Sequence, residues 1–166
     1  TAKTFHNFFK NKKIIKLYLA IISPPPSKNE KYITSNIEKS SFSNIRKMTT
    51  SNVKGKFAKT YMKTLEKNSK YALALLYPIT GRTHQLRVHM NYIRCSIIGD
   101  KKYKLNENFI DNENFLKLHS YVIKFPNEDF IKAPLPEHFI NFMKENKLDI
   151  NLEKIEIDFE KEFKYE

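Results

Sequence analysis

The sequence predicts an α+β domain, in which short helices pack on a β-sheet. Three apolar runs, at residues 14–22, 70–79 and 116–125, have the length and composition of strands. Residues 83–94 instead carry apolar side chains at helical spacing. With 166 residues and 40% hydrophobic content, the chain is long enough for one domain with its own core.

The first strand is predicted over 14–22, IIKLYLAII, which is rich in β-branched and aromatic residues. It stops at Ser23 and the three prolines that follow. Residues 27–56 consist mainly of Ser, Asn, Thr and Lys with scattered apolar residues, so we expect a long loop or low-complexity insertion there. Residues 56–68 are compatible with either a strand or a weak helix, and 70–79 predicts a strand that is interrupted at Pro78.

A helix is predicted next, because Leu86, Met90 and Ile93 fall on one helical stripe. Thr83 is expected to be its N-cap, which places Arg87 in the first turn. Residues 96–103 predict a short apolar segment and a Gly-Asp turn, and 116–125 alternates like a strand. A short helix should follow residues 134–136. Residues 1–144 then form the domain, and 145–166 form an extension, either an edge strand or a partner-binding tail.

The net charge is +12, from 30 Lys and Arg against 18 Asp and Glu, which indicates a polyanionic partner, with nucleic acid favoured over a membrane surface. Lysine excess is also typical of an A/T-rich coding sequence, so the arginines are more informative. Three of the four arginines lie between residues 82 and 94. The single cysteine, Cys95, excludes an intrachain disulfide and a Cys-based zinc cluster. No apolar run approaches the roughly 18 residues of a membrane span.

Those arginines belong to the segment TGRTHQLRVH, residues 80–89. Metal binding is disfavoured because His84 and His89 are five residues apart, which does not place them on one helix face. Nothing forms a recognisable nucleophilic triad with Cys95. Two interpretations stay open from the residues alone. The polar groups satisfy buried partners, or Arg82 and Arg87 bind an anion or RNA at a glycine turn before a helix.

The same segment resembles the signature of the RluA-type RNA pseudouridine synthases. The match continues through SIIGDKKY at 96–103, and the flanking strands and the APLPEHF segment at 133–139 follow in the family's order. The resemblance implies a mixed, mostly antiparallel sheet and an isomerase that converts uridine to pseudouridine without cofactor or metal. Its partner is RNA, rRNA or tRNA, whose target base is flipped into a pocket. No membrane partner is implied.

Residue roles are carried over from the resemblance by position. Tyr18 matches the tyrosine that stacks on the base and assists proton removal, and Arg87 matches the arginine that pairs with a catalytic aspartate. Substrate binding is expected of five further residues, namely Lys16, Arg82, His84, Gln85 and Ile98. Ile98 is expected to be an apolar pocket wall, while Gly81, Gly99 and Asp100 are expected to shape the backbone.

One departure affects the chemistry. The family's nucleophile lies in an Arg-Leu-Asp segment, and no Arg-Leu-Asp occurs in these 166 residues, where 147–149 (Lys-Leu-Asp) is the nearest lookalike. We therefore expect the C-terminal part of a catalytic domain, inactive alone. The alternatives are a non-catalytic RNA-binding protein with the same fold and, less favoured, a structural interaction module. A missing first part exposes a sheet edge, so poor solubility or a dimer is expected.

Overall fold

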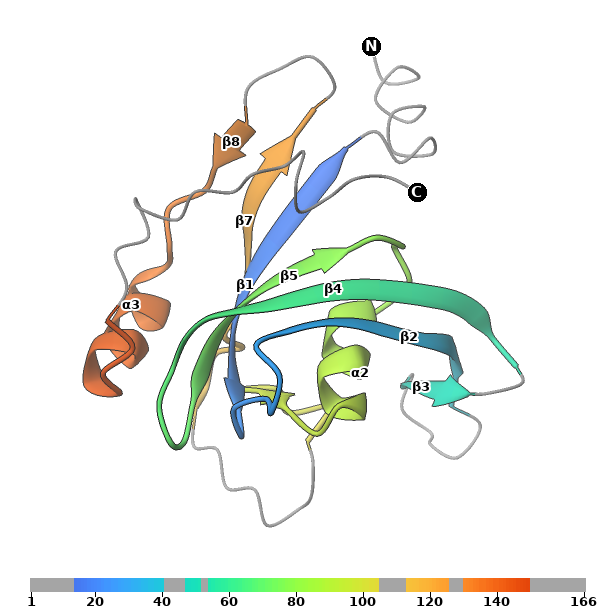
Figure 1. Ribbon diagram of the computed structural model, residues 1–166, viewed down its shortest axis with the longest axis horizontal. Coiled ribbons are helices and arrows are strands. Elements are labelled where there is room, and N and C mark those ends of the chain that lie inside the picture. Colours follow the sequence, from blue (N-terminus) through green and yellow to red (C-terminus); the bar gives the residue numbers. More distant parts are fainter. Residues whose placement is uncertain (1–13, 41–46, 52–53, 105–112, 126–129, 150–166) are drawn as a thin grey trace.

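The computed structural model describes residues 14–40, 47–51, 54–104, 113–125 and 130–149. Within these ranges the chain forms one eight-stranded sheet and two helices (Figure 1). The strands are β1 (Ile15–Ser23), β2 (Glu30–Lys39), β3 (Met48–Ser51), β4 (Lys56–Lys67), β5 (Ala72–Pro78), β6 (Ser96–Ile97), β7 (Leu118–Lys124) and β8 (Phe130–Lys132). The helices are α2 (Gln85–Tyr92) and α3 (Glu137–Glu145).

The strand order is β3-β2-β4-β5-β1-β7-β8, with β6 paired to β1 off this path. Every pairing among the described strands is antiparallel. The predicted α+β class with a mostly antiparallel sheet is therefore confirmed. The sheet ends at β3 and β8 within the described residues, and association through such an edge stays a prediction.

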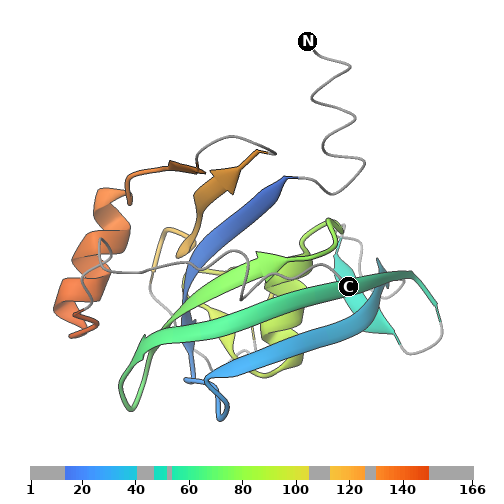
Figure 2. The ribbon, with the colours of Figure 1, turned by 45° about the horizontal axis from the view of Figure 1, so that its top comes forward.

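The centre of the sheet is buried on both faces, which explains the apolar runs of β1 and β5. In β1, Leu19 and Ile21 face α3, whereas Ala20 and Ile22 face α2. The same alternation holds in β5, where the leucines at 73 and 75 lie on the α3 side. In Figures 1 and 2, α2 lies within the curve of β5, β4 and β2, and α3 lies apart from it beside the other end of the sheet.

The segment 27–56, which was expected to be a long loop, contains the strands β2 and β3. Ile33 and Ile37 of β2 are buried, but the residue between them on that face is Ser35, whose hydroxyl is hydrogen-bonded to His89. A polar residue at an inward position interrupts the apolar alternation by which a strand is recognised. The ambiguous segment 56–68 forms a strand, β4.

The short helix after residues 134–136 is α3, with Pro136 at its N-cap. The expected C-terminal extension lies outside the described residues beyond Asp149, so its strand or tail character stays a prediction. Neither helix of the described chain is long and apolar enough to cross a membrane.

Candidate active site

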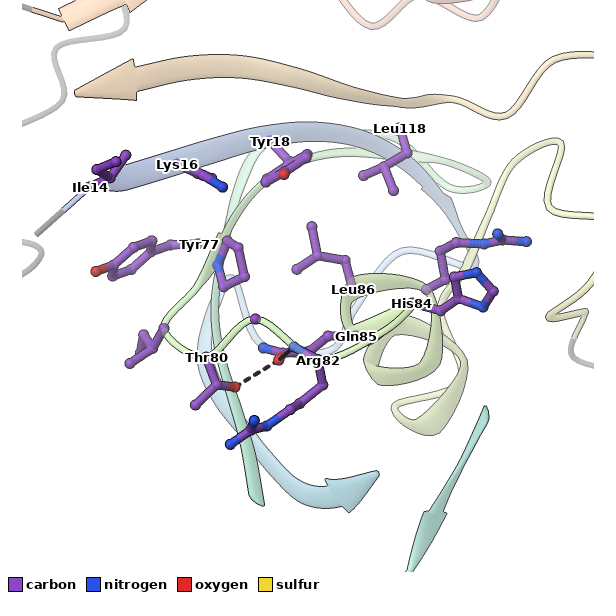
Figure 3. Close-up of a pocket in the computed structure, with 14 residues that line it drawn as sticks. Ile14, Lys16, Tyr18, Tyr77, Thr80, Arg82, His84, Gln85, Leu86 and Leu118 are labelled. Atoms are coloured by element: carbon purple, nitrogen blue, oxygen red, sulfur yellow. Dashed lines mark hydrogen bonds between the residues drawn. The ribbon is translucent and has the colours of Figure 1, made fainter. Parts of the chain in front are cut away.

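A pocket of about 360 Å³ lies between β1 and the beginning of α2. Figure 3 shows Lys16 and Tyr18 on β1 with Leu118 beside them, and Leu86 across the pocket from these three. The pocket brings together most of the residues expected from sequence, namely Lys16, Tyr18, Gly81, Arg82, His84, Gln85 and Arg87. Ile98, Gly99 and Asp100 are not among the residues that line it.

The β1 side of the pocket follows from strand alternation. Lys16 and Tyr18 are two residues apart in β1, so their side chains leave the same face of the sheet. Both are half-buried. Burial lowers the pKa of Lys16 below 10.5, because an ammonium is less favourable away from water. The pocket therefore has an aromatic hydroxyl and a cation side by side.

The helix side is anchored by an ion pair between Arg87 and Asp100. Arg87 Nε donates to Asp100 Oδ2 at 2.8 Å, and a terminal nitrogen, Nη2, donates to Oδ1 at 2.7 Å. The Asp100 side chain is 1% exposed and that of Arg87 is 21% exposed. Burial raises the pKa of Asp100, but hydrogen bonds from Arg87 and two backbone N–H groups outweigh it and hold the pKa below 3.8. The sequence predicts only that Asp100 shapes a turn, and the structure adds an ion pair with Arg87.

The turn that presents Asp100 needs glycine at position 99. Gly99 has φ +76°, and a Cβ there would collide with the carbonyl oxygen of Phe115. Asp100 Oδ1 then accepts the backbone N–H groups of Lys102 and Tyr103, both at 2.9 Å. The predicted Gly-Asp turn is present, and it aims the carboxylate at Arg87.

Gln85 braces the beginning of α2. Its side-chain oxygen accepts from the Thr80 hydroxyl at 2.7 Å and the Arg82 backbone at 3.0 Å, and its nitrogen donates to Lys59 O and Thr60 Oγ1, both at 2.9 Å. These four bonds use the whole capacity of a primary amide. The side chain was expected to bind substrate, but it has no donor left for it.

The predicted N-cap is wrong. The residue at that position is His84, with φ 55°, and it makes no side-chain cap bond. Thr83 lies one residue earlier, and the Gln85 side-chain oxygen instead accepts the backbone N–H of Arg82, which precedes the helix. Arg87 is nevertheless in the first turn, as expected.

His84 is held by Tyr103, the last residue of the SIIGDKKY segment. The Tyr103 hydroxyl lies 2.8 Å from His84 Nδ1 and accepts the Met48 backbone N–H at 3.0 Å. Tyr103 is only 3% exposed, and no other acceptor for its hydroxyl proton is found among the described residues. We infer that the hydroxyl donates to Nδ1, which puts the proton of the neutral ring on Nε2.

Burial, followed by the charges of Arg87 and Lys102, lowers the pKa of His84 below 6.5, so the ring is neutral at pH 7. We expect ¹⁵N spectra of histidine-labelled protein to show His84 with Nδ1 unprotonated. Tyr103→Phe removes the donor, so the Nδ1 resonance should move toward the protonated position as the two tautomers mix. Tyr92→Phe, at an exposed tyrosine of α2, should leave the resonance unchanged. A protonated Nδ1 in the parent protein would contradict this tautomer.

The surroundings of Ile98 and Gly81 differ from those that the sequence predicts. Ile98 is buried in the core on the α3 side with Ile21, and the apolar side chain of β7 that lines the pocket is Leu118. Gly81 lines the pocket, but a Cβ there would meet no atom within 4 Å. His84 and His89 have separate partners, since the His89 ring is bonded to Thr60 and Ser35.

This fold and pocket place the chain in a known protein family. Residues 1–92 match the model of the RNA pseudouridylate synthase family, and the chain belongs to that family. It is 36% identical over 140 residues to a ribosomal large subunit pseudouridine synthase C from Rickettsia conorii, a match covering 81% of this chain and 46% of that protein. It is 32% identical over 155 residues to a ribosomal large subunit pseudouridine synthase D from Borreliella burgdorferi, covering 89% and 47% respectively.

The chain thus spans about half the length of the curated relatives that it matches. A solved structure of the same kind, human RNA pseudouridylate synthase domain containing 1, is 25% identical with a TM-score of 0.71 over 82% of this chain and 60% of that one. A second human structure, domain containing 4, matches at 23% identity with a TM-score of 0.73, over 90% of this chain and 68% of that one. This second likeness supports the fold alone.

Proposed function

We propose that this chain is the C-terminal part of the catalytic domain of an enzyme that isomerises uridine to pseudouridine in structured RNA. The observation that supports this most directly is the meeting of Tyr18 and Arg87 in one pocket, from elements far apart in the sequence. Asp100 engages only Nε and Nη2 of Arg87. Among the described residues Nη1 has no hydrogen-bond partner, and we propose that this end of the guanidinium receives a second carboxylate.

The reaction needs no oxidant and no reductant, because its product is an isomer of its substrate. The bond between N1 of the uracil and C1′ of the ribose breaks, and a bond from C5 to C1′ forms. The proton at C5 is lost to a base, and N1 gains a proton. Protein groups that hold the detached uracil and move that proton are sufficient for these steps.

Five pocket residues have a role in this proposal. Tyr18 stacks on the flipped-out uracil and assists removal of the C5 proton. Arg87 keeps the attacking aspartate ionised. Arg82 and Lys16 bind phosphate or base oxygens, and His84 offers its Nε2–H to an acceptor of the RNA. The aspartate itself is not among the pocket residues described, so the chain alone is inactive in this proposal.

Ribosomal RNA is the first substrate to test, because the relatives are named for the large ribosomal subunit. Transfer RNA is the second. The test is release of tritium from large-subunit rRNA labelled at C5 of uridine, with this chain and with a version extended at its N-terminus by the aspartate segment of a relative. We expect no release from the chain alone and release from the extended protein.

A conservative change separates chemistry from binding. Tyr18→Phe in the extended protein keeps the aromatic ring but removes the hydroxyl, so tritium release should slow by roughly 10²-fold or more while RNA affinity stays the same. Tyr92→Phe is the matched control and should behave like the parent. If the extended protein binds RNA but releases no tritium from rRNA or tRNA, the non-catalytic RNA-binding alternative replaces the enzyme.

A further inference from the structure

Two large aromatic side chains are exposed on the face of the sheet opposite α2. Tyr32 of β2 is 54% exposed and Phe57 of β4 is 53% exposed. Tyr32 is paired with Tyr61, and Phe57 is four residues before Tyr61 in the same strand, so all three lie on one face. Lys59 lies between Phe57 and Tyr61 on that face. We refer to Tyr32, Phe57 and Lys59 as the aromatic strip.

The strip is held in place by its neighbours. The Tyr32 ring packs against the buried Tyr61 ring, with centroids 5.1 Å apart and planes tilted by 50°. Lys59 Nζ lies 4.8 Å from the centre of the Tyr32 ring, where the ring's quadrupole attracts a cation. Aromatic rings fixed in this way lose little conformational entropy when a flat ligand stacks on them.

The strip is continuous with the pocket by two routes. Arg82, which lines the pocket, donates from Nε to the backbone oxygen of Phe57 at 2.9 Å. Tyr77, which also lines the pocket, is the register partner of Tyr61 in the next strand. Tyr18 and Leu86 of the pocket lie on the α2 side of the sheet, whereas the strip lies on the opposite face. Arg82 follows the end of β5 and contacts both, so the proposed path of the polymer runs around the end of β5 past this side chain.

The chemistry of the strip fits single-stranded RNA. Bases stack on tyrosine and phenylalanine whatever their sequence, and lysine and arginine beside the rings attract phosphates. Two acidic residues of β2 lie on the same face as the strip. Glu30 is paired with Lys63 at 3.9 Å, and Glu38 lies two residues beyond Asn36, the register partner of Phe57. The four-residue offset between the two rings is roughly 13 Å along the strand, so they contact different bases.

We propose that the aromatic strip is a docking surface for the single-stranded RNA segment that flanks the nucleotide held in the pocket. The inference rests on the proposed function for the identity of the polymer as RNA. It adds a path for the RNA, from the pocket across Arg82 to Phe57 and Tyr32. Affinity for a plain oligonucleotide should then depend on the strip, with no contribution from catalysis.

The test measures binding of a fluorescently labelled 12-residue oligouridine to this chain at low salt. Tyr32→Ala and Phe57→Ala should each weaken binding about tenfold, whereas Tyr32→Phe should bind like the parent, since stacking needs only the ring. Lys59→Ala should reduce the slope of log affinity against log salt by about one. Phe130→Ala, at an equally exposed phenylalanine of β8, is the control, and thermal melting verifies folding.

The proposal is overturned if oligouridine affinity is the same in the strip variants Tyr32→Ala and Phe57→Ala as in the control Phe130→Ala. That outcome holds even if the extended protein forms pseudouridine. Strip variants that bind weakly, in a protein that never releases tritium, would support the strip and reject the enzyme. If the parent chain binds no oligouridine, the strip proposal fails, and tritium release from rRNA still decides the proposed function. If the strip variants instead shift the sedimentation coefficient, the surface is an interface between copies and the proposal is overturned.

Discussion

Replacing Arg87 with methionine should lower the free energy of unfolding by about 3 kcal/mol, because it leaves a carboxylate buried without its charged partner. The Asp100 side chain is 1% exposed and receives two charge-assisted hydrogen bonds from Arg87. Methionine fills much of the same volume but donates nothing. Urea unfolding at pH 7 measures the loss.

A second substitution separates the buried charge from the packing. Asp100→Asn removes the charge yet keeps an oxygen for the Lys102 and Tyr103 backbone donors. The double variant Arg87→Met/Asp100→Asn should therefore be more stable than Arg87→Met alone. Arg94→Met, at an exposed arginine after α2, should cost less than roughly 0.5 kcal/mol. A double variant less stable than Arg87→Met would show that the pair acts through packing.

The ion pair also has a defined pH dependence. The pKa of Asp100 lies below 3.8 in the folded protein, so its stabilising contribution is present above that value and is lost as pH falls through the folded pKa. In Arg87→Met the lone buried carboxyl binds a proton at higher pH. The stability difference between parent and variant should consequently shrink in acid.

How far the sequence predicts this fold depends on the local pattern of each element. β1, β5 and β7 are apolar runs bounded by polar residues or proline, and the structure places strands there. Strand β2 was missed because Ser35 occupies an inward position, and the reason for a serine there is His89, more than 50 residues later. A polar contact between distant segments leaves no periodic signal in either one.

The same reasoning applies to the site. The clustered arginines and the family resemblance led to the pocket, including Tyr18 and Arg87. The pairing of Arg87 with Asp100 was not foreseen, because the resemblance directed attention to an aspartate outside this chain. The role of Tyr103 was not predicted either. Its hydroxyl contacts Met48 of β3 and His84 at the start of α2, and neither contact leaves a local pattern in the sequence. The resemblance predicts that Ile98 forms the apolar wall of the pocket, but Leu118 lies there. Ile98 instead packs in the core on the α3 side, with the residues of β1 whose side chains point away from the pocket.

Helix α2 presents Arg87 and His84 to the pocket, and polar contacts attach it to the sheet. Gln85 bonds to β4 at Lys59 and Thr60, and His89 bonds to Thr60 and to Ser35. Gln85, His89 and Thr60 are buried, so their hydrogen bonds fix the helix in one register. The histidines and glutamine of the TGRTHQLRVH segment thus position α2, and Arg87 of the same segment forms an ion pair with Asp100.

The stability of the protein should fall by about 3 kcal/mol between pH 6.5 and pH 4 because of His89. Burial lowers the pKa of this residue from 6.5 to about 4, and the side chain is 0% exposed. Between these two values the unfolded chain binds a proton that the folded chain does not. Stability therefore rises with pH across this window. The contribution of His89 is fully present above 6.5, the pKa of histidine in the unfolded chain.

Urea unfolding at half-unit pH steps measures this slope, and His89→Gln is the matched variant. Glutamine does not titrate but can still reach a hydroxyl, so the variant should lose most of the pH dependence between 6.5 and 4 while unfolding as cooperatively as the parent. His84→Asn provides the comparison at a half-buried histidine, whose pKa is also lowered. If His89→Gln keeps the full slope, another group binds the proton, and the neutral ring between Thr60 and Ser35 is not the acid-sensitive part of the fold.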